Sequence, residues 1–141
     1  MNKMFPLGAV LSVTTGRLLC DIGDVYMILN HVTGDNLFTH VLPRACRFAE
    51  PLIKAKYPEL DAAGKPENMA KLDTLIADAK ARNEALMVAC KTWLDWMQEP
   101  GTLGLAKEYD IASHEDSWIV RDPVEEIESM VGKEKVIVIN P

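Results

Sequence analysis

The chain has 141 residues, of which 48% are hydrophobic and 26% charged, and its formal net charge is −6. This length and composition are typical of one domain that folds around its own core, and they exclude a disordered chain. The three cysteines are odd in number and far apart, and each lies in an apolar run, which predicts a reducing, cytoplasmic compartment. No apolar run approaches the roughly 20 residues of a membrane span, and the N-terminus lacks a signal-peptide pattern.

The charge is unevenly distributed along the chain. Residues 1–58 hold six basic and four acidic side chains, whereas residues 107–128 hold two basic and eight acidic ones. An acidic segment repels phosphate backbones and attracts basic partners, so nucleic acid is not an expected partner. A solvated acidic surface without any partner would have the same composition, and both interpretations stay open.

The first half of the chain predicts a strand followed by two helices. Residues 7–15 (LGAVLSVTT) are rich in β-branched and aliphatic side chains, which predicts a strand. A 3.6-residue apolar period predicts a short helix over residues 25–32, closed by Gly34. A second helix is expected over residues 43–56, kinked or split at Pro51.

The second half predicts one dominant helix. Residues 67–98 repeat apolar side chains with a helical period and contain no Gly or Pro, which predicts a helix about 45 Å long. Because this length exceeds the diameter of such a domain, the helix should bend, break or project, and Asn83 on its apolar stripe hints at a break. The remainder predicts, in order, a loop-rich stretch to residue 116, a short strand over 117–121, a short helix over 122–132 and a strand over 136–139.

These elements predict a single α+β domain over residues 1–141. In the expected architecture, the N-terminal strand over 7–15 pairs with the C-terminal strand over 136–139 in a small two- or three-stranded sheet. About four helices, one of them long, would pack on one face of this sheet.

No complete catalytic or metal-binding motif occurs. The three histidines are not spaced with cysteines or acids as zinc ligands are, and the glycines match neither a phosphate loop nor a dinucleotide fingerprint. His31-Val32-Thr33 fits the tripeptide of two-histidine phosphoesterases, but the second tripeptide that this acid–base chemistry needs is absent. We therefore assign no catalytic residue, expect no metal or cofactor, and favour a protein that is not an enzyme.

The densest run of polar functional side chains is residues 34–44, just before a predicted helix N-terminus that attracts anions. Together with Arg17, this run could hold a small anionic or nucleotide-like ligand, as in a binding protein or a modest enzyme. In the structural alternative, which we favour, these side chains form a turn and cap the helix. The candidate ligand-binding residues are Arg17, Asp35, Asn36, Thr39, His40 and Arg44.

Tryptophans and carboxylates mark a candidate partner surface. Trp96 lies at the edge of the apolar stripe of the long helix, where a tryptophan is usually a lid on the core but is also a frequent interface anchor. The candidate partner-binding residues are Trp96, Glu115, Asp116, Trp118, Glu125 and Glu126. In a third alternative, two copies of the chain pair through the stripe between residues 72 and 97.

Five short motifs stand out: TTGRLL at 14–19, YMILN at 26–30, TGDNLFTH at 33–40, LPRA at 42–45 and DPVEE at 122–126. With the first four motifs, the N-terminal third resembles a family of small uncharacterised proteins of tailed phages and proteobacterial prophages, and DPVEE resembles the tail end of that family. The resemblance implies a phage accessory protein of the bacterial cytoplasm, and it supplies no chemistry. Such a protein would bind and inhibit or modulate a host protein or protein complex, for example a defence factor.

Overall fold

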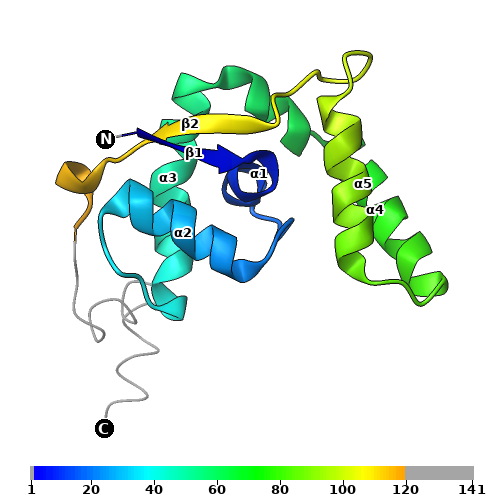
Figure 1. Cartoon of the computed structure of the whole chain (residues 1–141), viewed down its shortest axis with the longest axis horizontal. Coiled ribbons are helices and arrows are strands. Elements are labelled where there is room, and N and C mark those ends of the chain that lie inside the picture. Colours follow the sequence, from blue (N-terminus) through cyan, green and yellow to red (C-terminus); the bar gives the residue numbers. More distant parts are fainter. Residues whose placement is uncertain (1, 120–141) are drawn as a thin grey trace, which may run out of the picture.

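The computed structural model describes residues 2–119 (Figure 1). Strand β1 (Asn2–Pro6) pairs antiparallel with strand β2 (Glu108–Ala112), with Met4 opposite Asp110. The helices are α1 (Leu7–Thr15), α2 (Ile22–Thr33), α3 (Leu42–Lys56), α4 (Pro66–Ala81) and α5 (Leu86–Gln98), and the 3-10 turns are η1 (Thr39–Val41), η2 (Pro58–Gly64) and η3 (Glu115–Ser117). The predicted α+β class with a small sheet is confirmed, and the sheet of the described residues has two strands.

The strand predicted over residues 7–15 is wrong, because these residues form helix α1. Every residue from Leu7 to Thr14 is buried, and α1 lies at the centre of the domain, in contact with α2, α3 and β1 (Figure 1). A helix that is apolar on all sides can be stable only in such a position. A short continuous apolar run fits a buried helix as well as a strand, and here burial outweighed the β-propensity of its valines and threonines.

The two helices predicted in the first half are confirmed as α2 and α3. Gly34 ends α2 in the left-handed conformation, with φ 69°, and its N–H bonds the carbonyl of Asn30. Helix α3 runs continuously through Pro51, so the predicted split does not occur. Because proline has no N–H, Pro51 cannot donate the helical hydrogen bond to the carbonyl of Arg47. Both residues are exposed, so water can donate to that carbonyl instead.

The single long helix predicted over residues 67–98 is wrong, and the break at Asn83 is confirmed. Asn83 adopts φ 57°, and the chain reverses between α4 and α5 to form a helical hairpin beside the rest of the domain (Figure 1). Part of the apolar stripe lies between the two helices and the core, where Leu72, Trp93 and Met97 are fully buried. The chain itself covers these three side chains, whereas Leu86 of the same stripe is exposed.

The remaining predictions concern the chain after the helical hairpin. Strand β2 lies in the stretch that we expected to be loop-rich. Residues 117–119 form no strand, because Ser117 ends η3. The helix predicted over 122–132 and the strand predicted over 136–139 lie outside the described residues. No helix within residues 2–119 is long and apolar enough to span a membrane.

Candidate functional site

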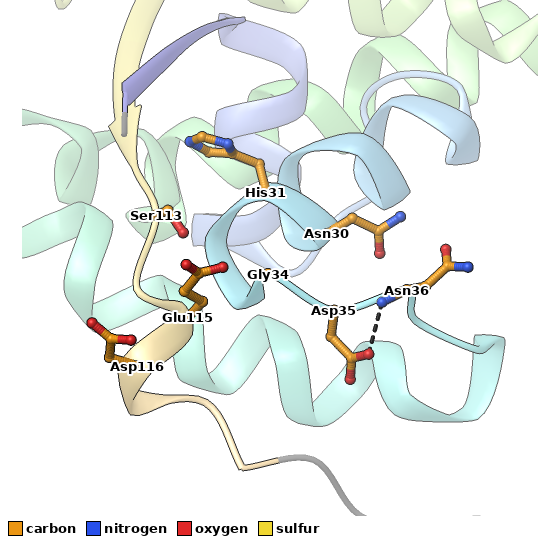
Figure 2. Close-up of a pocket in the computed structure, with 8 residues that line it drawn as sticks. All are labelled: Asn30, His31, Gly34, Asp35, Asn36, Ser113, Glu115 and Asp116. Atoms are coloured by element: carbon orange, nitrogen blue, oxygen red, sulfur yellow. Dashed lines mark hydrogen bonds between the residues drawn. The ribbon is translucent and has the colours of Figure 1, made fainter.

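An open hollow of about 630 Å³ lies between the end of α2 and the segment that follows β2 (Figure 2). Figure 2 shows its two walls: one wall comes from the last turn of α2 and the turn after it, and the other comes from the end of β2 and η3. The lining residues are Asn30, His31, Gly34, Asp35, Asn36, Ser113, Glu115 and Asp116.

The first wall owes its shape to Gly34. After Gly34 ends α2, the carboxylate of Asp35 accepts the N–H of Asn36 at 2.7 Å, which closes a tight turn. The side chain of Asn30 accepts the N–H of Leu37 at 3.1 Å and ties the turn back to the helix. Asp35 and Asn36 therefore stand on a braced turn rather than on a loose loop.

The second wall is held against the first by the backbone and by close packing. The N–H of His114 donates to the carbonyl of Val32 at 2.7 Å, which joins the segment after β2 to α2. The side chain of Glu115 lies directly over Gly34, where a Cβ on residue 34 would overlap it. Glycine is therefore required at this position both for its left-handed backbone and for its lack of a side chain.

The hollow is acidic. Asp35, Glu115 and Asp116 contribute carboxylates, and the described lining residues include no lysine or arginine. The ring of His31 is already engaged, because its Nε2 lies 2.8 Å from the carbonyl oxygen of Ile111. Such a lining attracts ammonium and guanidinium groups and repels phosphate. Within residues 2–119, no group of histidine, cysteine and acidic side chains could hold a metal ion.

Trp118 connects the second wall to Asp35 of the first wall and to helix α3. Its Nε1 donates to Asp35 at 3.1 Å, and the guanidinium of Arg44 lies 3.9 Å from the ring centre. Phe48 meets the same ring edge-on, with centroids 5.1 Å apart. Trp118 is 7% exposed, so it packs inside the protein and offers little surface to a partner.

The structure thus brings together members of both predicted sets. Asp35 and Asn36, from the ligand set, share the hollow with Glu115 and Asp116, from the partner set. Arg44 and Trp118 support it from behind. Glu125 and Glu126 lie outside the described residues.

The other predicted residues lie outside this hollow. Arg17 forms an ion pair with Asp73 of α4, with 2.7 Å between Nη2 and Oδ1. The hydroxyl of Thr39 lies 2.5 Å from that of Tyr26.

Two aromatic members of the predicted sets also lie elsewhere. His40 stacks on Phe38, with ring planes 2° apart. Trp96 lies half-buried on α5, with the ammonium of Lys71 5.6 Å from its ring.

Sequence reasoning missed three lining residues, namely Asn30, His31 and Ser113. The first two occupy the last turn of the helix predicted over 25–32, directly before Gly34, and this position could have indicated that they lie beside Asp35. No sequence signal connects Ser113 to this place, because it reaches the hollow only through the pairing of β1 with β2.

None of the three thiols is activated. Cys20, Cys46 and Cys90 are free, and burial raises the pKa of each thiol above its ordinary value. A raised pKa lowers the fraction of nucleophilic thiolate at neutral pH, which is the reverse of what a catalytic cysteine needs.

Comparisons with known proteins match part of the chain. Residues 5–63 match a family described as "Domain of unknown function (DUF7736)". No curated protein and no solved structure gives a match to this chain. The matched residues include α1, α2 and α3 and the first wall of the hollow, whereas the helical hairpin, β2 and the second wall lie beyond them.

Proposed function

We propose that this chain is a non-enzymatic phage accessory protein that binds a host protein or protein complex through the acidic hollow. The observation that carries the proposal is the convergence of Asp35, Glu115 and Asp116 from two distant parts of the chain. A surface of this kind complements lysine and arginine side chains on a partner. Host complexes that bind nucleic acid, defence factors among them, present such basic surfaces, and covering one of them would inhibit or modulate it.

Three further observations support a binding role over catalysis. Two of the hollow's carboxylates, on Glu115 and Asp116, belong to exposed residues, and His31 is occupied by a backbone carbonyl. The thiols are half-buried or buried, and burial raises the pKa of each, so none is activated. The phage context rests on the resemblance of residues 14–45, which lie inside the range matched by the domain family, and free thiols suit the bacterial cytoplasm.

A small-ligand site is the second candidate. A volume of about 630 Å³ falls within the range of small-molecule pockets. The charge of the described lining favours a cationic ligand such as an amine, and it weighs against the anionic or nucleotide-like ligand suggested by Arg17 and Arg44. A thermal-shift screen of polyamines against nucleotides would separate this candidate from partner binding.

The test is a pull-down from host lysate at low salt with the full chain as bait. Glu115→Gln combined with Asp116→Asn removes two charges from the hollow, and Asp78→Asn with Asp95→Asn removes two exposed charges from the hairpin as a matched control.

We expect wild type and control to recover the same host protein, and the hollow variant to recover about tenfold less of it. Recovery should also fall as salt is added, because these charges are solvent-exposed. Recovery of nothing above background, or equal recovery by all three baits, would contradict the proposal.

A further inference from the structure

A second concave surface lies between the α1–α2 link and α5, and it shares no lining residue with the acidic hollow. It is a groove of about 320 Å³. Its lining residues are Pro6, Gly8, Ala9, Leu19, Cys20, Asp21, Asp24, Met87, Lys91 and Leu94. Figure 1 shows the link between α1 and α2 extending toward the helical hairpin at this place.

Exposed apolar side chains occur in the two segments that form the groove. Among residues 2–119, nine large hydrophobic side chains are exposed, and five of them, with exposures between 44% and 54%, belong to these segments: Leu18, Ile22, Leu86, Met87 and Val88. Met87 lines the groove itself, and the other four are sequence neighbours of lining residues. The groove therefore has an exposed apolar side chain in its lining and more apolar surface on the same segments.

The bottom of the groove is apolar and depends on a glycine. Leu19 is buried beneath it and Leu94 is half-buried at its side. A Cβ at Gly8 would come within 3.2 Å of Leu94 Cδ1 and 3.5 Å of Cys20 Cβ, so any larger residue would begin to fill the groove. The space suits one or two inserted side chains rather than a whole helix.

The rim of the groove carries two carboxylates and one ammonium group, so its net charge is negative. Asp21 and Asp24 stand at the start of α2, and neither carboxylate has a hydrogen-bond or ion-pair partner among the described residues. Lys91 lines the opposite side, and no ion pair joins it to either of them. A partner's basic group could therefore bond both carboxylates while its apolar neighbour enters the groove.

We infer that this groove binds a partner's peptide segment in which a large aliphatic side chain stands next to a lysine or arginine. The aliphatic side chain packs between Met87 and Leu94, and the basic side chain pairs with Asp21 and Asp24. The groove extends the proposed function by a second contact, and it rests on separate residues, so either surface can fail without the other.

Cys20 allows a direct test because it is one of the residues that line the groove and it is half-buried. Cys46 is also half-buried but lies on α3 and does not line the groove, so it serves as an internal reference. The full chain is alkylated with iodoacetamide in the presence of a synthetic amphipathic peptide of leucine and lysine. A second peptide replaces every lysine by glutamate and keeps the leucine spacing.

We expect the lysine peptide to slow labelling of Cys20 about fivefold near saturation and to leave Cys46 unchanged. The glutamate peptide should protect neither thiol. Equal protection by both peptides, equal effects on both thiols, or no protection would overturn the inference. Protection of Cys20 that rises with protein concentration alone would show that a second copy fills the groove, which also overturns it.

Variants then separate the two parts of the recognition. Asp21→Asn with Asp24→Asn should weaken the lysine peptide about tenfold, and Met87→Ser should weaken it by a similar factor. Both changes are expected to leave the fold intact, because Asp21 makes no side-chain cap bond and Met87 is exposed. The hairpin variant Asp78→Asn with Asp95→Asn removes two exposed charges that line neither concave surface, so it is the matched control and should bind like wild type. A loss equal to that of the groove variants would refute the assignment to this groove.

Discussion

Gly34 lies where the two walls of the acidic hollow meet, and replacing it by alanine tests the contact between Gly34 and Glu115. The replacement should lower the free energy of unfolding for two reasons. Residue 34 has φ 69°, and an L-residue held in the left-handed region costs about 1 kcal/mol relative to glycine. The new Cβ would also overlap Glu115, including its Cβ. Because a Cβ moves only with its backbone, the segment carrying η3 must shift, and such overpacking costs about 1–3 kcal/mol.

Gly16 provides a matched control. It also ends a helix in the left-handed conformation, with φ 75°, but a Cβ there would meet no atom within 4 Å. Gly16→Ala should therefore lose only the backbone cost, about 1 kcal/mol, whereas Gly34→Ala should lose about 3 kcal/mol. The free energy of unfolding is measured by urea denaturation, with circular dichroism and tryptophan fluorescence as two probes.

A double variant checks the cause of the larger loss. Removing the Glu115 side chain in Glu115→Gly should make Gly34→Ala no more costly than Gly16→Ala, because the overlapping atoms are gone. If Gly34→Ala and Gly16→Ala lose the same stability in the wild-type background, Glu115 does not pack on Gly34. The second wall would then lie elsewhere, and the acidic hollow would have to be abandoned.

Two further predictions concern the support of the hollow and the thiols. Trp118→Phe removes the N–H bond to Asp35 and part of the ring and should cost about 1–2 kcal/mol, whereas Trp118→Ala also removes the contacts with Arg44 and Phe48 and should cost about 3–5 kcal/mol in the same assay. Equal losses would show that the ring is not packed. Burial raises the pKa of each thiol, so the unfolded chain ionises first as pH rises, and the free energy of unfolding should fall above the ordinary thiol range. Replacing all three cysteines by alanine should flatten this fall, and an unchanged slope would assign it to other groups.

Helices α2 and α3 were predictable because local signals and tertiary structure agree there. The apolar period of α2 and the glycine that ends it point to the same boundaries, and the proline near the start of α3 does likewise. In residues 7–15 the local signal was ambiguous, since nothing in the run shows whether neighbours cover one side or all sides. Burial of α1 among α2, α3 and β1 decided the outcome.

The helical hairpin shows a different limit of sequence reasoning. The apolar period continues from α4 into α5 without a Gly or Pro, so the pattern resembles that of one helix. The reversal rests on Asn83, one of the few residues besides glycine that adopt the left-handed conformation readily. Its position on the stripe indicated the break, but the direction of the chain afterwards depends on packing between α4 and α5, which no local pattern encodes.

The sequence identified the two walls of the candidate site separately. Composition singled out residues 34–44 and the acidic segment around 115 as separate features, and nothing in the sequence says that they meet. They meet because β2 pairs with β1, and the segment after β2 then runs past the end of α2. The same pairing depends on Asn2–Pro6, which composition did not identify as a strand. Arg17 was grouped with residues 34–44 only because its guanidinium could bind an anion. In the structure it pairs with Asp73 of α4, and this contact depends on how the helical hairpin packs.

Both candidate binding surfaces lie where the segment matched by the domain family meets the rest of the chain. In the hollow, Asp35 comes from the matched range and Glu115 from beyond it, and in the groove Asp21 and Asp24 face Met87 across the same division. The matched range supplies the buried framework of α1, α2 and α3. Residues beyond it complete each surface, so if the two surfaces bind as proposed, binding should depend on the helical hairpin and the segment after β2 as well as on this framework.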